Sequence, residues 1–413
     1  MKTIPARATN DALRRIAVWS CLGCAALSFV GCRRHDFPSY PANYREYVYV
    51  ANSGSNTVSA IDTVNLRLDR EIAVGVHPIA LLASRSRNQI YVLNSGASNA
   101  ETRSSGSVTI LDSEHQTAIA TLAVGQSPVS FALSPDDRFA YVTSAGRLPT
   151  ERPSLLILDL VNRRVTANLP LDLLPSQVAV APDGQSVLIS SAANNSLTIL
   201  TADESAMRWT MRARITGCSG ADALAILPDS SKAFVACSHG HQVMAVALAW
   251  QKNAHAGHSE ARPDALEAML NVGQTPGYLA LKPDGGELFV SNTGSNSISE
   301  IVTTSDDVGG TYLIGSAPEF GLVSADNSRL YESSLQSQEI AVYSIDDGRR
   351  EGTIHVGDGP DQLAFSASGH LLFAVDRRSG DVAAIRTSTQ SLFTLLPVGR
   401  TPVAIADKSF TLP

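Results

Sequence analysis

The chain has 413 residues, of which 39 are acidic and 32 basic, and its formal net charge is −7. Its Lys and Arg residues form no run longer than short pairs such as Arg163-Arg164 and Arg377-Arg378. A protein that binds phosphate backbones needs a basic patch that releases counterions, so we expect no nucleic-acid partner.

The first 31 residues have the charge pattern of an export signal. Lys2, Arg7, Arg14 and Arg15 precede an apolar stretch over residues 16–30. The Arg14-Arg15 pair also allows a twin-arginine signal, although its flanking residues match that type poorly. Removal of residues 1–31 takes away these four cations and one acid, so the formal charge of the mature chain is −10.

Cys32 stands where bacterial lipoprotein signals are cleaved and lipidated, after the small residue Gly31. We therefore predict a lipid on Cys32, with ordinary export or an uncut anchor as the alternatives, since Phe29 replaces the usual Leu. Residues 32–43, which include Pro38 and Pro41, are predicted to form a tether, and residues 44–413 a single domain.

Two sequence features recur eight times after residue 43. The first is a strand-end position that closes a short apolar run, at Asn52, Asn94, Ser144, Ser191, Cys237, Asn292, Ser334 and Asp376. The second is a G-x-x-P motif that begins at Gly75, Gly125, Asp172, Cys218, Gly273, Gly315, Gly357 and Gly399. Each motif from Gly75 to Gly357 lies 19 residues before the next strand-end position, within a period of 42 to 55 residues. That regularity indicates a propeller or a solenoid.

Four short apolar runs fill each repeat, as in residues 278–281, 288–290, 297–301 and 312–314. Turn residues such as Lys282-Pro283-Asp284-Gly285 separate them, and four strands per repeat predict propeller blades. The sequence predicts an all-β propeller of eight blades, with seven as the alternative if one weak repeat is not a sheet. Residues 44–74 contain three strands and residues 402–406 a lone first strand, so the C-terminal strand is expected to complete the first blade.

The stretch from Tyr49 to Asp62, followed by Ile72 to Pro78, resembles the repeats of the YVTN β-propeller family. The resemblance covers residues 44–413 and concerns strand and turn residues, so it is specific for architecture. It implies a cell-envelope protein that binds or supports a partner, and some relatives lie beside redox or haem proteins. Members are mostly seven-bladed, and eight repeats depart from that pattern.

Two cysteines remain in the mature domain after Cys21 and Cys24 leave with the signal and Cys32 takes a lipid. Cys218 occupies a motif glycine position, and Cys237 occupies the strand-end position of the same blade. We predict a disulfide between them, with two buried thiols as the alternative. Simple hairpin pairing places Cys218 a few residues beyond the partner of Cys237, so the loop must fold back.

The same blade also contains His239, His241, His255 and His258, and their spacings suit a soft divalent metal. The topology places the loop of His239 and His241 on the opposite face from the insertion of His255 and His258. We therefore expect no single cluster and no bound cofactor. A divalent metal at His239 and His241 is the alternative.

Recognition is expected on the face that carries the G-x-x-P motifs and the loops after each second strand, because loops on a rigid scaffold usually bind ligands. The predicted binding residues are His77, Asn94, His239, His241, Asn292, Asp358, Asp376 and Arg400.

The sequence favours a monomeric, non-catalytic envelope propeller that binds a protein or envelope component. One alternative is a metal-dependent lactonase-type hydrolase, which needs carboxylates and Asn side chains around a metal. Asn52, Asn94, Asn292 and Asp376 recur at one depth, but such regularity is better explained by turn capping. Another alternative is a redox- or haem-associated propeller.

Overall fold

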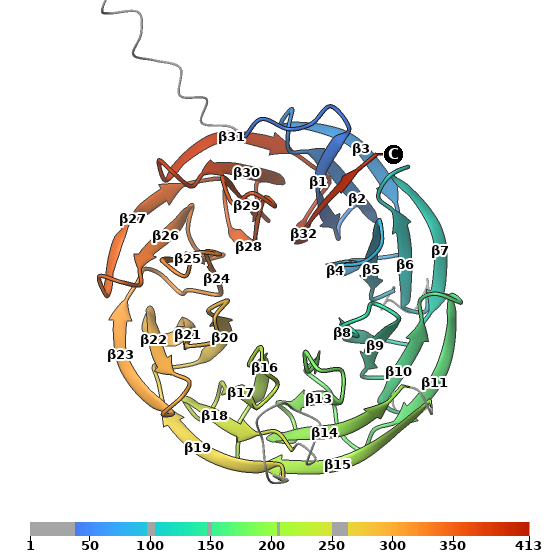
Figure 1. Cartoon of the computed structure of the whole chain (residues 1–413), viewed down its shortest axis with the longest axis vertical. Helices are drawn as coiled ribbons and strands as arrows, with labels where there is room; N and C mark the ends of the chain where they lie inside the picture. Colours follow the sequence, from blue (N-terminus) through green and yellow to red (C-terminus); the bar gives the residue numbers. More distant parts are fainter. Residues whose placement is uncertain (1–37, 97–103, 147–150, 205–206, 250–262, 413) are drawn as a thin grey trace, which may run out of the picture. The chain divides into compact units, whose positions relative to one another are not determined.

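The computed structural model describes residues 38–96, 104–146, 151–204, 207–249 and 263–412. The predicted signal, Cys32, His255 and His258 lie outside these ranges. The unit Asn43–Pro413 contains eight antiparallel sheets of four strands each, arranged in a ring (Figure 1).

Blades 2 to 8 each consist of four consecutive strands joined by three hairpins, and the strands of every blade are ordered from the centre of the ring outward (Figure 1). Blades 2 to 4 are β4 (Pro78–Ala83), β5 (Gln89–Asn94), β6 (Ser107–Asp112), β7 (Thr117–Ala123); β8 (Pro128–Leu133), β9 (Phe139–Ser144), β10 (Ser154–Asp159), β11 (Arg164–Pro170); and β12 (Gln177–Val180), β13 (Ser186–Ser191), β14 (Ser196–Asp203), β15 (Arg208–Thr216). Blades 5 and 6 are β16 (Ala221–Ile226), β17 (Lys232–Cys237), β18 (Gln242–Ala247), β19 (Ala265–Asn271); and β20 (Pro276–Leu281), β21 (Glu287–Asn292), β22 (Ser297–Val302), β23 (Asp307–Leu313). Blades 7 and 8 are β24 (Phe320–Val323), β25 (Arg329–Ser333), β26 (Glu339–Ser344), β27 (Arg349–His355); and β28 (Pro360–Phe365), β29 (Leu371–Asp376), β30 (Asp381–Arg386), β31 (Ser391–Pro397).

The two ends of the domain meet in blade 1, which confirms the predicted closure. This blade contains β32 (Pro402–Thr411), β1 (Tyr44–Asn52), β2 (Thr57–Asp62) and β3 (Arg67–Ala73). β1 pairs with β32 along its whole length, from Tyr44 opposite Thr411 to Asn52 opposite Pro402. Eight complete sheets rule out the seven-bladed alternative.

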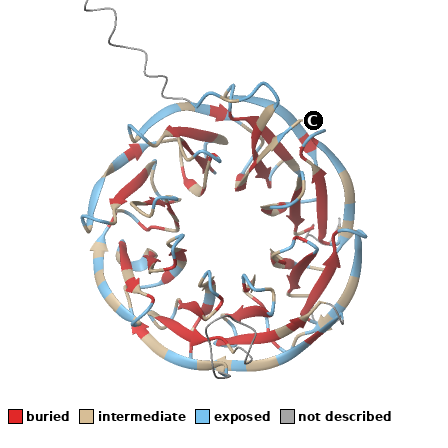
Figure 2. Ribbon diagram, viewed as in Figure 1, coloured by how far each residue is buried: buried red, intermediate tan, exposed pale blue. Residues whose placement is uncertain are grey.

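The hydrophobic core lies between neighbouring blades, on the second and third strands of each sheet (Figure 2). Every residue of β9 is buried, whereas all but one residue of the outer strand β3 are exposed. Inner strands such as β4 are buried at every third residue and partly exposed between. Partly exposed side chains on the inner strands are therefore the ones open to solvent near the axis of the ring.

All eight blades carry a bulge at the same place, in the pairing of the third strand with the outer strand. In blade 1 the register shifts between Ala60 and Ile61, and in blade 6 between Glu300 and Ile301. A bulge increases the local twist, so the outer strands curve away from the core. Apart from a short 3-10 turn, η1 (Thr293–Ser295), no helix occurs in the described part of the chain, and none there is long and apolar enough to cross a membrane.

Candidate functional site

Where the strand-end residue is asparagine or aspartate, the motif glycine lies in tight contact with its side chain, as at Gly75, Gly273 and Gly357. A Cβ atom built on Gly75 would lie 2.6 Å from Cγ of Asn94, and one on Gly273 would lie 2.6 Å from Cγ of Asn292. Both distances are too short for a real side chain. The motif therefore needs glycine wherever asparagine fills the space beneath it.

Asn94 and Asn292 are fully buried, and their side chains form hydrogen bonds within their own blades. Nδ2 of Asn94 donates to Oγ of Ser107 at 3.1 Å, and Nδ2 of Asn292 donates to Oγ of Ser299 at 3.0 Å. These two predicted binding residues are thus closed to a ligand in this structure. They tie the second strand to the third, which agrees with a structural explanation of their regularity.

Asp376 occupies the strand-end position of blade 8 and forms a carboxyl pair with Asp381, its register partner on β30. Oδ2 of Asp376 accepts the N–H of Gly357 at 3.0 Å. Burial, followed by the nearby carboxyl of Asp381, raises the pKa of Asp376 to about 8. The pair therefore retains a proton at neutral pH, and Asp376 is buried like the asparagines.

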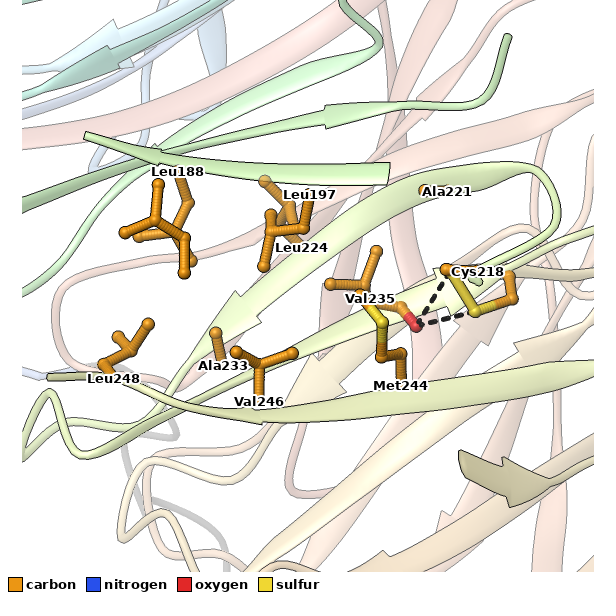
Figure 3. Close-up of a cluster of buried hydrophobic side chains, with 12 residues drawn as sticks. Leu188, Leu197, Cys218, Ala221, Leu224, Ala233, Val235, Met244, Val246 and Leu248 are labelled. Carbon is orange, nitrogen blue, oxygen red and sulfur yellow. Dashed lines mark hydrogen bonds between the residues drawn. A yellow bond between two sulfur atoms is a disulfide. The ribbon is translucent and has the colours of Figure 1, made fainter. Parts of the chain in front are cut away.

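In blade 5 a disulfide replaces the glycine–asparagine contact. Cys218 and Cys237 are bonded at an S–S distance of 2.06 Å, with their Cα atoms 5.0 Å apart. Cys237 faces Ala221 across the hairpin, so Cys218 lies three residues beyond that partner and folds back as predicted. Both sulfur atoms lie beside the carbonyl oxygen of Val235 in the core between blades 4 and 5 (Figure 3).

His241 takes a turn position that asparagine holds in other blades. Its Nδ1 accepts the N–H of Thr275 at 3.1 Å, and its φ is 54°. Oδ1 of Asn56 accepts the N–H of His77 at 2.8 Å in the same way, and φ of Asn56 is 57°. The sequence contained this equivalence, because Asn56 and His241 each follow a strand-end position by four residues.

The predicted metal site at His239 and His241 gains no further ligands from the structure. No group of three His, Cys, Asp or Glu side chains that could hold a metal occurs in the described ranges. His239 is exposed, and Nδ1 of His241 is already used by a backbone N–H. The geometry thus explains His241 as a link between blades 5 and 6.

A charged cluster that the sequence analysis missed lies where the inner strands of blades 7 and 8 begin. Arg377 is 3.5 Å from Oδ2 of Asp361, and Arg378 is 3.6 Å from Oδ1 of Asp358. Burial and then the neighbouring Asp361 raise the pKa of Glu319, and burial raises the pKa of Asp361 against the opposing effect of Arg377. We call these five residues the rim cluster.

Two of the three rim carboxylates follow a positional rule. Glu319 and Asp361 come directly after the motif prolines Pro318 and Pro360, and Asp222 holds the equivalent position in blade 5. All three lie at the start of inner strands or directly before them. An acid immediately after the motif was the sequence signal that could have found them.

The other predicted residues of this face are placed in its loops. His77 is exposed, and its Nδ1 lies 2.9 Å from Oγ of Ser95. Arg400 is exposed too, and its backbone carbonyl accepts the N–H of Gly54 at 2.9 Å. Only Asp358 among the predicted residues belongs to the rim cluster.

The same face carries a pocket of about 480 Å³ between Arg152-Pro153 and the loop 171–174.

No family model and no curated protein matches this sequence. Solved structures do match it. The dihydro-heme d1 dehydrogenase NirN in complex with DHE has a TM-score of 0.68 at 17% identity, over 92% of this chain and 78% of that chain. Apo AztD from Citrobacter koseri has a TM-score of 0.63 at 12% identity, over 89% and 98%. The periplasmic gluconolactonase PpgL of Pseudomonas aeruginosa has a TM-score of 0.55 at 17% identity, over 88% and 98%.

The chain is an eight-bladed β-propeller. At these levels of identity the neighbours share the propeller fold with it, and the different descriptions of the three leave its activity to be argued from its own residues.

Proposed function

We propose that this propeller is an exported, lipid-anchored binding protein of the YVTN-repeat type, which recognises a protein or envelope ligand and carries out no chemistry. The single observation that carries the proposal is the rim cluster. Support for export comes from the signal-like N-terminus and from the periplasmic location that one structural neighbour's description states.

The rim cluster suits recognition because its ion pairs are loose and partly exposed. The side chains of Arg377 and Arg378 are 43% and 53% exposed, and each carboxylate contact is at least 3.5 Å long. Exposed pairs of this kind contribute little to stability, so their guanidinium groups keep free donors for a ligand. The opposite charges side by side favour a partner with both acidic and basic groups.

The topology supports the same face for binding. The chain enters the propeller at Tyr44, and β1 ends at Asn52 beside the G-x-x-P motifs. The chain therefore enters the propeller domain at the end opposite the rim cluster.

The test is site-specific photo-cross-linking in cells with a probe placed at Asp358, in the wild-type background and in Arg377→Ala/Arg378→Ala. A defined adduct in the wild type that is lost in the double variant supports the proposal. Arg349→Ala removes an exposed arginine from the outer strand β27 and serves as the control that keeps the adduct. No adduct, or equal loss in the control, contradicts it, as does a stoichiometric metal or a Soret band in the purified protein.

A lactonase-type hydrolase is the second candidate, and the equivalent inner-strand carboxylates Asp222, Glu319 and Asp361 favour it. One structural neighbour is described as a gluconolactonase. Hydrolysis of gluconolactone by the purified propeller, with and without added divalent metal, decides this candidate. Activity that Glu319→Gln and Asp361→Asn abolish would replace the binding proposal, and absence of activity would remove the candidate.

A further inference from the structure

A pocket of about 350 Å³ opens between blades 7 and 8, at the end of the propeller opposite the G-x-x-P motifs. Its walls come from the first turns of the two blades, residues 324–329 and 365–369, and from Thr387 and Ser388. It shares no residue with the rim cluster. The binding function proposed above does not use it.

The pocket exists because a side chain that bridges other blades is missing here. Oδ2 of Asp137 in blade 3 accepts hydrogen bonds from the hydroxyls of Ser84 and Ser86 in blade 2, at 2.8 and 2.9 Å. Oγ of Ser230 in blade 5 accepts the N–H of Asp183 in blade 4 at 3.0 Å. Asp137 and Ser230 hold the same position in the turn between the first and second strands of their blades. At this position the side chain lies close to the neighbouring blade.

Blade 8 has Gly369 at that turn position. Its φ is +72°, and a Cβ atom built on it meets no heavy atom of the described residues within 4 Å. A Cβ on Gly184 in blade 4 would lie 3.5 Å from Pro135 of blade 3, whereas blade 7 has Ala325 at that proline position. The space filled by Asp137, Ser230 or such a proline at other junctions is therefore left open between blades 7 and 8.

Tyr331 brings its hydroxyl group to the wall of the pocket. Its side chain is 2% exposed and lines the pocket, and its hydroxyl has no hydrogen-bond partner among the described residues. The equivalent hydroxyls of Tyr49 and Tyr91 do have partners, the carbonyl of Ser113 and Oε1 of Gln89, both at 2.9 Å. The Tyr331 hydroxyl is not fully enclosed by protein, so it is open to a ligand in the pocket.

Of the two charged groups of the pocket, Arg329 is paired with a carboxylate of the protein and Asp326 is not paired with a cation of the described residues. Nε of Arg329 donates to Glu351 at 2.8 Å, and Asp326 accepts the hydroxyl of Ser328 at 2.8 Å. Thr387 donates its hydroxyl to the carbonyl of Gly369 at 2.9 Å and keeps acceptor lone pairs. The pocket therefore offers mainly acceptors, among them the carboxylate of Asp326, whose hydrogen-bond partners are neutral groups of Ser324 and Ser328.

The remaining wall is aromatic. Phe365 packs edge-on against Tyr331 with ring centroids 5.7 Å apart. Aromatic surface suits the C–H faces of a sugar ring, and oxygen acceptors suit its hydroxyl groups. The volume lies within the range of small-molecule sites. We propose that this pocket binds a neutral saccharide.

The test is calorimetric titration of the propeller with glucose and with N-acetylglucosamine, and with acetate and ethanolamine as charged probes of similar or smaller size. Saturable binding of at least one sugar is expected. Gly369→Asn should abolish it, since asparagine tolerates positive φ and its side chain restores the missing bridge. Tyr331→Phe should weaken it about tenfold, the effect of one lost hydrogen bond.

Gly184→Asn is the matched control, because Gly184 has φ +74° and holds the same turn position in blade 4, away from the pocket. It should bind the sugar as the wild type does, and both asparagine variants should keep the wild-type melting temperature. The proposal is overturned if neither sugar binds, if Gly369→Asn binds as well as the control, or if acetate or ethanolamine binds more tightly than either sugar.

Discussion

Cys218 is bonded to Cys237 at the two positions where blade 2 places Gly75 directly over the buried side chain of Asn94. A Cβ at the glycine position overlaps the asparagine, so the glycine position does not tolerate a side chain while the asparagine remains. The disulfide resolves this conflict, because its two Cβ atoms are linked through sulfur in the same space. The two cysteines of blade 5 therefore act as a unit that takes the place of the glycine–asparagine pair.

Cys237→Ala should lower the free energy of unfolding by about 3 kcal/mol, through the loss of a cross-link that spans 19 residues. Cys218→Gly/Cys237→Asn loses the same cross-link but restores the contact of the other blades, so it should be more stable than the single variant. Urea unfolding of both variants, with reduced wild type as reference, measures this. A double variant less stable than Cys237→Ala would show that the two pairs are not equivalent.

Gly75→Ala should destabilise the propeller by about 1–3 kcal/mol, because its new Cβ lies 2.6 Å from Cγ of the buried Asn94. Adding Asn94→Ala should cost less than the sum of the two single changes, since it removes the clash. Gly352→Ala is the control, because the nearest atom to a Cβ there is 3.9 Å away. If the losses of stability of the two single variants simply add in the double variant, a clash does not explain the 19-residue spacing between the motif glycine and the strand-end residue.

Blade 7 replaces an apolar pair of the core by a carboxyl and a glycine. Glu332 is 2% exposed and faces Gly321 on β24, where blade 6 has Val290 opposite Leu279. Its two carboxyl oxygens lie 3.1 and 3.0 Å from the hydroxyl of Ser291. Burial raises the pKa of Glu332 to about 8, so the group is protonated at neutral pH.

This carboxyl should make the propeller less stable as pH rises. Between the pKa of about 4.5 that Glu332 has when unfolded and the folded value of about 8, the folded state binds one more proton, so stability falls by about 1.4 kcal/mol per pH unit. Glu332→Gln removes that proton and should reduce the slope accordingly, which melting curves from pH 5 to 8 measure. An unchanged slope would show that Glu332 is ionised in the folded state.

Cys32→Ser should move the protein from the membrane fraction to the soluble envelope fraction, because a lipid on Cys32 is the proposed anchor. The measurement is metabolic labelling with a radioactive fatty acid followed by fractionation. Cys24→Ser, a change within the predicted signal, is the control and should remain labelled. Membrane association without label would favour an uncut anchor.

The sequence predicted the fold because each blade repeats the same turn and strand residues at a constant offset. It predicted the disulfide because Cys218 and Cys237 both depart from that repeat. It missed Glu332, whose neighbours Gly321 and Ser291 come from another strand and another blade. It also missed the rim cluster, since the pairing of Asp361 with Arg377 depends on how the G-x-x-P motif and the loop after the second strand meet in space.

The role of His241 can be tested by exchange with the residue that other blades use. His241→Asn should keep the wild-type melting temperature, because an asparagine there can accept the N–H of Thr275 as Asn56 accepts that of His77. His241→Ala should lose about 1 kcal/mol with that hydrogen bond, whereas His239→Ala, at an exposed position of the same turn, should be neutral. Elemental analysis of the three variants tests the alternative, that His241 binds a metal. Bound metal that both alanine variants lose would make His241 a ligand, and its contact with Thr275 would then be secondary.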